Sequence, residues 1–167
     1  MNPNEILVGV IGHLYSENEE RGIFKTNDGG NTWYKTLYID NETGIIDLDI
    51  DPNDFNIQFA SSWQRNRSSW NFSGNGKNSG IYKSIDAGEN WTLVSTVASG
   101  FPNNEGVGRI GISIFDSNTI YAILDNQNRR PKLEEVKKEV LNKNSFEKIS
   151  QNDFLKLDNN ELQKFLK

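Results

Sequence analysis

The sequence contains no cysteine, so disulfide frameworks and thiolate metal sites are excluded. It has one histidine, His13, which leaves a histidine metal centre without a second ligand of its kind. We therefore expect no metal and no cofactor. No apolar stretch is long enough to span a bilayer, so we expect no membrane insertion. Residues 1–5 lack the basic and apolar regions of a signal peptide, and we expect none in this chain.

Positive charge is also scarce, because 18 Lys and Arg face 23 Asp and Glu, for a net charge of -5. Nucleic-acid-binding domains usually present a basic face, so we expect no nucleic-acid partner. Aromatic residues are plentiful instead, with four Trp, five Tyr and nine Phe. Hydrophobic residues make up only 35% of the chain. This combination favours short, half-buried strands with aromatic anchors over one large uniform core.

The chain contains two copies of one pattern, at residues 22–33 and 80–91. The first copy is Gly-Ile-Phe-Lys-Thr-Asn-Asp-Gly-Gly-Asn-Thr-Trp, and the second is Gly-Ile-Tyr-Lys-Ser-Ile-Asp-Ala-Gly-Glu-Asn-Trp. They align without a gap at a constant offset of 58 residues. A repeat at this spacing is typical of architectures built from stacked, similar units.

Each element of the pattern has a mechanical reason. The Gly-Ile-aromatic-Lys segment alternates sides, which predicts a strand with one buried face. The Asp carboxylate can accept hydrogen bonds from the backbone of the turn that follows, and the second Gly supplies a positive φ. The Trp ring can fold back over the turn, so we expect a self-capped β-hairpin. The residues expected to hold the two turns are Thr26, Asp28, Gly30 and Trp33, and Ser84, Asp86, Gly88 and Trp91.

These two segments resemble the Asp-box, or bacterial neuraminidase repeat (BNR), of sialidases, some xyloglucan-cleaving glycosidases, sortilin-type receptors and photosystem assembly factors. The wider sequence is similar to long, exported, sortilin-like BNR proteins of bacteria. That similarity is carried by residues 12–15, 18–22, 40–44, 63–72 and 108–111 and covers most of residues 1–131. It implies a β-propeller whose boxes close the hairpin between the third and fourth strands of each blade, and an extracellular or periplasmic location.

Strands flanking the boxes allow the blades to be counted. Residues 45–51 and 109–115 alternate as first strands, and residues 6–11, 57–63 and 119–124 follow as second strands. With blade strands named A to D, the chain runs B-C-D, A-B-C-D, A-B. We therefore expect an all-β partial propeller of about two blades over residues 1–131 and a helical tail over residues 132–167. A ring usually needs four to eight blades, so the expected partners are the remaining blades of a longer parent chain, or other copies.

Strand direction places the boxes at one end of each blade and the loops at 14–21, 39–44, 65–78 and 97–108 at the other. The loop from Gln64 to Asn78 is the richest, because arginine beside an exposed indole can grip carboxylates and stack on sugars. Alternatively, its arginines pair with carboxylates of the blades and Trp70 pins the loop. The residues predicted to form a ligand face are Arg65, Arg67, Trp70, Phe72 and His13.

Two other groups of residues suggest structural roles. His13 lies near a strand end beside Glu17, Glu19 and Glu20, and without partners it favours pinning of the loop. Asp47, Asp49 and Asp51 share one face of a strand. They lack the Gly and terminal Glu of a calcium loop, so we expect a solvated face or pairing between blades.

A glycosidase needs two carboxylates across the scissile bond, and the resemblance to sialidases adds an arginine triad and a Tyr nucleophile. The sequence does not bring Arg65, Arg67 and Arg109 together. We therefore expect no catalytic residue in this chain, and predict a non-catalytic propeller segment that recognises protein or glycan. The alternatives are part of a sialidase-like or xyloglucanase-like glycoside hydrolase, or pure architecture.

After Pro131 the apolar spacing changes from two to about 3.6, with Leu133, Val136, Val140 and Leu141 in a mixed Lys/Glu run. Ser150 with Asp153, and Asp158 with Glu161, are typical of N-cap pairs that open two short helices. We expect the apolar side of this tail to pack on a blade or on other parts of the parent chain. Its charged side is expected to be solvated.

Overall fold

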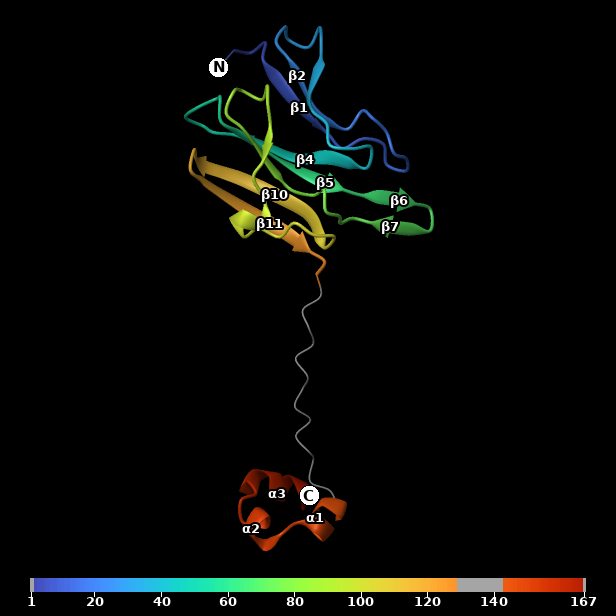
Figure 1. Cartoon of the computed structure of the whole chain (residues 1–167), viewed down its shortest axis with the longest axis vertical. Coiled ribbons are helices and arrows are strands. Elements are labelled where there is room, and N and C mark those ends of the chain that lie inside the picture. The colour runs from blue at the N-terminus through green and yellow to red at the C-terminus, as the bar shows by residue number, and fades with distance from the viewer. Residues whose placement is uncertain (1, 129–142, 167) are drawn as a thin grey trace. The chain divides into compact units, whose positions relative to one another are not determined.

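The computed structural model describes residues 2–128 and 143–166. Two compact units divide the chain, Met1–Asn128 and Arg129–Lys167 (Figure 1). Each unit is described by itself. Among the described residues, no helix combines the length and the apolar character that a membrane crossing requires.

The first unit is built of antiparallel sheets. The first sheet has the order β1 (Ile6–Val10), β2 (Gly22–Thr26), β3 (Tyr34–Leu37). The second has the order β4 (Thr43–Ile50), β5 (Gln58–Gln64), β8 (Ile81–Ser84), β9 (Thr92–Leu93). The third pairs β10 (Val107–Asp116) with β11 (Thr119–Asn126). A short hairpin of β6 (Asn66–Ser68) and β7 (Asn71–Ser73) and a 3₁₀ turn at Val97–Ser99 complete the unit.

The predicted all-β class is confirmed. In chain order, the three main sheets contain three, four and two strands. The hairpin β6–β7 was not predicted. It lies inside the segment from Gln64 to Asn78, which the sequence analysis treated as a loop. Short polar strands of this kind have no alternating apolar pattern to announce them.

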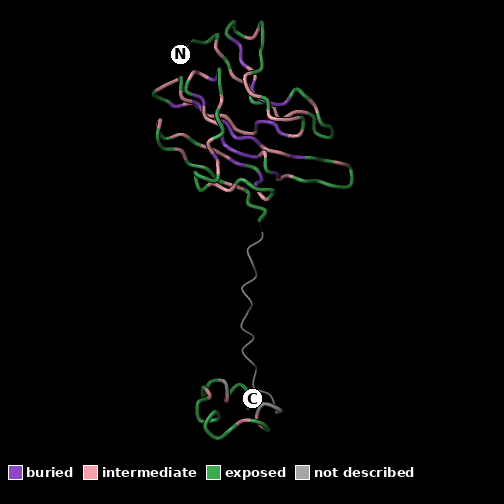
Figure 2. The backbone as a smooth tube through the Cα atoms, in the orientation of Figure 1, coloured by how far each residue is buried: buried purple, intermediate pink, exposed green. Residues whose placement is uncertain are grey.

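The three sheets are stacked on two separate cores. Ile23 of β2 packs with Ile45 and Ala60 between the first and second sheets. Phe59 packs with Ile110 and its neighbours between the second and third. Because Phe59 and Ala60 are consecutive on β5, their side chains leave opposite faces of the strand. The second sheet is thus covered on both faces, and Figure 2 shows the buried segments concentrated in the middle of this unit.

Two aspartates of β4 and a third directly after its end join the second sheet to the third. The Asp47 and Asp49 carboxylates each accept a backbone N–H from β10, of Ile112 and Ile114, at 2.9 Å. The Ser117 hydroxyl donates to Asp51 at 2.6 Å, and this bond holds the pKa of Asp51 below its usual value. Of the two predicted roles, pairing between neighbouring sheets agrees with these bonds.

The second unit contains three short helices, α1 (Lys143–Lys148), α2 (Gln151–Phe154) and α3 (Asn159–Phe165). Ser150 caps α2 by accepting the Asp153 N–H at 3.2 Å, and Asp158 caps α3 by accepting the Asn160 N–H at 3.2 Å. Both predicted N-caps are confirmed. The rings of Phe146, Phe154 and Phe165 pack together, with centroids 6.2 and 4.5 Å from Phe146. The predicted helical run at residues 133–141 lies outside the described residues.

Candidate functional site

The first copy of the repeat, residues 22–33 and here called the first box, closes the turn between β2 and β3 with its own side chains. The Thr26 hydroxyl accepts the Gly30 N–H at 3.0 Å and donates to Asp28 Oδ1 at 2.7 Å. The Asp28 carboxylate also accepts the backbone N–H and the hydroxyl of Thr32, at 2.9 and 2.6 Å. The Trp33 indole donates to the Gly30 carbonyl at 3.0 Å, so the ring folds back over the turn. Gly30 has the predicted positive φ, of 95°.

The second copy of the repeat, residues 80–91 and here called the second box, forms the equivalent hydrogen bonds between β8 and β9. The Ser84 hydroxyl accepts the Gly88 N–H at 2.9 Å and donates to Asp86 at 2.7 Å. The Asp86 carboxylate accepts two hydrogen bonds from Asn90, at 2.9 and 2.8 Å. The Trp91 indole donates to the Gly88 carbonyl at 3.1 Å. The predicted self-capped turn therefore accounts for the Ser or Thr, the Asp, the second Gly and the Trp that the two copies share.

The hydrogen bonds lower the pKa of both box carboxylates. The side-chain bond from Thr32, followed by its backbone N–H, lowers the pKa of Asp28 to about 2. The two bonds from Asn90 lower the pKa of Asp86 to about 2 in the same way. Both groups are therefore ionised acceptors across the physiological pH range, which suits a structural role and does not suit a general acid.

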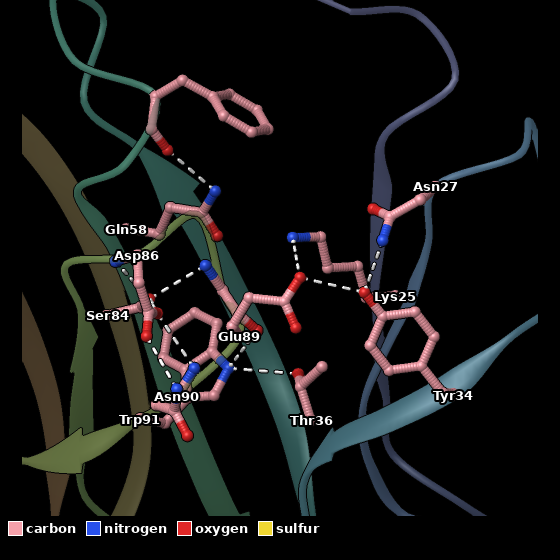
Figure 3. A network of polar contacts seen from close by, with 12 residues as sticks. Lys25, Asn27, Tyr34, Thr36, Gln58, Ser84, Asp86, Glu89, Asn90 and Trp91 are labelled. Atoms are coloured by element: carbon pink, nitrogen blue, oxygen red, sulfur yellow. Dashed lines mark hydrogen bonds and ion pairs between the residues drawn. The ribbon is translucent and has the colours of Figure 1, made fainter.

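The second box also joins the second sheet to the first. The Lys25 ammonium of β2 is buried and lies 2.6 Å from the Glu89 carboxylate in the second box (Figure 3). The Tyr34 hydroxyl donates to the same Glu89 oxygen at 3.0 Å. The Trp91 indole has a second acceptor, the Thr36 hydroxyl of β3, at 3.2 Å. The box end of the stack is thus held together by polar contacts between the first and second sheets.

Arg21 organises the opposite end of the first sheet. Its guanidinium is buried and donates to four backbone carbonyls. One terminal nitrogen donates to Ile11 and Glu42 at 2.9 and 3.0 Å, and the other to His13 and Ser16 at 3.3 and 3.1 Å. These four bonds use all its terminal N–H groups. Arg21 is therefore a clamp that shapes the segment between β1 and β2.

Arg65 lies beside this clamp and has few partners. Its side chain is buried, and its one hydrogen bond goes to the His13 carbonyl at 3.2 Å. Its Nε atom is buried without a partner. Within the described ranges, no carboxylate lies within 4.0 Å of its guanidinium. Burial, and then the positive charge of Arg67, lower the pKa of Arg65 below its usual value.

The hairpin β6–β7 carries the other predicted ligand residues. The Arg67 guanidinium lies 4.6 Å from the centroid of the Phe72 ring. The Phe72 and Trp63 rings pack edge to face, with their centroids 6.2 Å apart. Trp63 donates to the Gly74 carbonyl at 2.7 Å, so Trp63 and Phe72 hold the hairpin. Trp70 is 88% exposed. The alternative prediction that Trp70 pins this loop is therefore wrong.

A polar cavity of about 210 Å³ lies where the clamped segment meets the hairpin. It brings together Arg65 and Arg67, two of the residues predicted for a ligand face, and adds Arg21. Trp70, Phe72 and His13 do not line it. Three arginines against one glutamate give the lining a positive charge. The lining residues are Leu14, Tyr15, Ser16, Glu17, Arg21, Arg65, Asn66, Arg67 and Ser68.

The two acidic neighbours of the cavity have other partners. The Glu17 carboxylate accepts the Asn41 side-chain N–H at 2.6 Å. The His13 imidazole is 60% exposed, contacts the Ser16 hydroxyl at 3.1 Å, and lies 3.5 Å from the exposed Glu20 carboxylate. The predicted role of His13 in pinning its loop agrees with these contacts. Its backbone carbonyl, which both buried arginines share, is its contribution to the site.

Arg21 was missed by the sequence analysis, although a signal was present. It directly precedes the repeated Gly22, and its counterpart 58 residues later is Ser79. Ser79 is also buried, and its hydroxyl accepts the Gln64 N–H at 3.0 Å. In both copies the residue before the repeat binds backbone of an adjacent segment. A buried polar residue at this position could have been expected from the alignment of the two copies.

Comparison with known protein families, with curated proteins and with solved structures finds no match to this chain. The likeness to sortilin-like BNR proteins therefore rests on the residues themselves and stays a prediction. Chemically, the two ends of the stack differ clearly. One end is closed by the two boxes. The other end presents guanidinium N–H donors that the described residues leave without acceptors.

Proposed function

We propose that this chain is a non-catalytic segment of an Asp-box β-propeller that recognises protein or glycan at the end opposite the boxes. The cavity that holds Arg65 and Arg67 carries this proposal, because a buried, weakly partnered cation beside open space favours an external acceptor. An exported location, extracellular or periplasmic, follows from the sequence resemblance.

The two outer faces of the stack support further blades as partners. Beside Trp33 on the first sheet, Val8, Val10 and Phe24 line an open, largely apolar hollow. On the third sheet, Tyr121 and Ile123 are 67% and 77% exposed. Apolar faces of this kind favour interaction sites over bare surface. We infer that each face stacks on another blade, as the covered faces of the second sheet do.

The repeat offers a second argument that further blades stack beside the third sheet. Lys83 stands 58 positions after Lys25, at the same place on the next sheet. Lys25 has Glu89 of the following box as its partner. Lys83 has no carboxylate partner among the described residues; its ammonium contacts the Ser117 carbonyl at 3.5 Å and lies 5.2 Å from the centroid of the Phe59 ring. A further box beside the third sheet could supply the matching carboxylate. Reading the gene on either side of this segment tests the idea: further copies of the pattern near a 58-residue spacing support it, and stop codons on both sides contradict it.

Binding is tested by a glycan and peptide array probed with the chain and with Arg65→Ala and Trp70→Ala. Arg109→Ala is the matched control, because Arg109 is an exposed arginine outside the cavity. We expect signals that the first two changes weaken and the control retains. Signals unaltered by both changes would show that the ligand face lies elsewhere, and an array without any signal would favour pure architecture.

One observation favours the second candidate, a sialidase-like glycosidase. The cavity adds Tyr15 and Glu17 to its arginines, the residue types that a tyrosine nucleophile and its base require. Against this, the Glu17 carboxylate accepts from Asn41, and no bond among the described residues joins it to Tyr15. Arg21 has no terminal donor free for a substrate. Hydrolysis of an aryl-glycoside panel, abolished by Glu17→Gln, would establish the enzyme and overturn the binding proposal.

A further inference from the structure

We infer that the ligand of the arginine cavity is the carboxylate of an acidic sugar unit in a polysaccharide, held by Arg65 and Arg67. This inference rests on the proposed function and names its ligand class. It depends on three features of the described residues: the free donors of Arg65, the fixed position of Arg67, and the polar character of the wall.

The first feature is the donor count of Arg65. A guanidinium has five N–H groups in a planar fork, and the described contacts of Arg65 use one of them. Its side chain is buried, so the unused donors receive little hydration. A carboxylate is the acceptor that matches this fork, because two parallel bonds can form at once. The cavity gives such a group direct access to Arg65.

Arg67 supplies the second charge. It is exposed, and its guanidinium is held over the Phe72 ring at 4.6 Å. Stacking restricts the plane of the guanidinium and leaves its edge free for an acceptor. Arg21 has a different role here. Because its terminal N–H groups are already used on carbonyls, it is a positioning residue that holds the wall against which Arg65 is placed.

The rest of the lining favours a sugar over an apolar peptide end. Ser16, Asn66 and Ser68 offer hydroxyl and amide groups that can bond to sugar hydroxyls, and the wall exposes little apolar surface. About 210 Å³ is small for a drug-sized ligand and suits one compact polar unit. Two exposed aromatic rings, Tyr15 in the lining and Trp70 at the turn of the β6–β7 hairpin, can stack on neighbouring units.

Calorimetric titration of the full chain with oligogalacturonate tests this inference, with a neutral galactan oligosaccharide of equal length as the matched ligand. We expect the acidic oligosaccharide to bind and the neutral one to bind at least about 10-fold more weakly, since it lacks the charged acceptor. Arg65→Ala and Arg67→Ala are each expected to weaken binding about 10-fold or more. Arg65→Lys is expected to weaken it several-fold, because an ammonium cannot reproduce the bidentate fork.

The controls separate the inference from the proposed function. Arg109→Ala is expected to bind as the unchanged chain does. Arg67 is exposed, so Arg67→Ala remains informative even if Arg65→Ala fails to fold. Equal binding of both oligosaccharides, or binding that survives Arg67→Ala, overturns the acidic-sugar inference. Binding of a peptide C-terminal carboxylate or of inorganic phosphate instead of the uronate also overturns it, while leaving recognition intact. A chain that binds none of these ligands, and nothing on the array, contradicts both.

Discussion

Two buried cations of the first unit show how differently its two ends are built. At the box end, the Lys25 ammonium has a carboxylate, Glu89, at 2.6 Å, and that carboxylate is further bound by Tyr34. At the opposite end, the equally inaccessible Arg65 has one carbonyl contact and no carboxylate among the described residues. A buried charge is costly unless it is paired. The contrast therefore separates an end that completes itself from an end that needs an acceptor from outside.

The largest expected effect is at the paired cation. Glu89→Ala leaves the Lys25 ammonium buried without its carboxylate, which is expected to lower the free energy of unfolding by about 2 kcal/mol. This value is lower than the loss expected for a fully buried ion pair, because the Glu89 side chain is 43% exposed. Urea denaturation followed by tryptophan fluorescence measures the change.

Arg65→Met is the matched change at the unpaired cation. Because it removes a buried charge that has no carboxylate partner among the described residues, we expect the free energy of unfolding to stay equal or to rise. The His13 carbonyl keeps its bond to Arg21 in this variant. If Arg65→Met destabilises the chain as much as Glu89→Ala does, the Arg65 end does not lack the stabilising contacts that the box end has.

Acid is expected to weaken the box end. The pKa values of Asp28 and Asp86 are lowered from 3.8 to about 2, so their contribution is complete above pH 4 and is lost as the pH falls toward 2. The lowered pKa of Glu89, caused first by its bond from Lys25, acts in the same direction. Urea midpoints measured from pH 6 to pH 2 should fall across this window. A double change of Asp28 and Asp86 to Asn should make the curve flatter, and an unchanged slope would show that the box carboxylates contribute nothing.

A smaller effect is expected at the position where both boxes have a positive φ but different residues. Ala87 is the sole non-glycine residue with a positive φ in the described chain, at 58°, where the first box has Gly29 at 72°. A left-handed conformation costs an alanine about 1 kcal/mol. Ala87→Gly is therefore expected to stabilise the second turn by up to that amount, and Gly29→Ala to destabilise the first by a similar amount. Thermal denaturation of the two single variants should move the Tm in opposite directions.

How much could be predicted depended on whether the contacts were local or between sheets. The repeat predicted both hairpins, because the bonds from Thr26 and Asp28 close within a few residues of one turn. The contact of Lys25 with Glu89 was not predicted, since it joins residues 64 positions apart through sheet stacking. The convergence of Arg21 with Arg65 was missed for the same physical reason.

The sequence predicted which loop forms the ligand end, but not how the side chains of that loop are arranged. Arg65 and Arg67 were found because strand direction places their segment opposite the boxes, and the cavity brings the two side chains together. The hairpin β6–β7 was missed, and with it the opposite roles of Trp63 and Trp70. One indole is anchored on the Gly74 carbonyl and the other points to solvent. Residue type alone cannot distinguish an anchor from an exposed ring.

The smallest expected effect on stability is at Trp70, and it gives the most direct test of the comparison. Because 88% of this side chain is exposed, Trp70→Ala is expected to change the free energy of unfolding by less than about 0.5 kcal/mol. Trp63→Ala, which removes a bond at 2.7 Å and the contact with Phe72, should destabilise the chain clearly. A loss of oligosaccharide binding in Trp70→Ala would assign the ring to the ligand. Unchanged binding and unchanged stability together would leave the ligand face with the arginines alone.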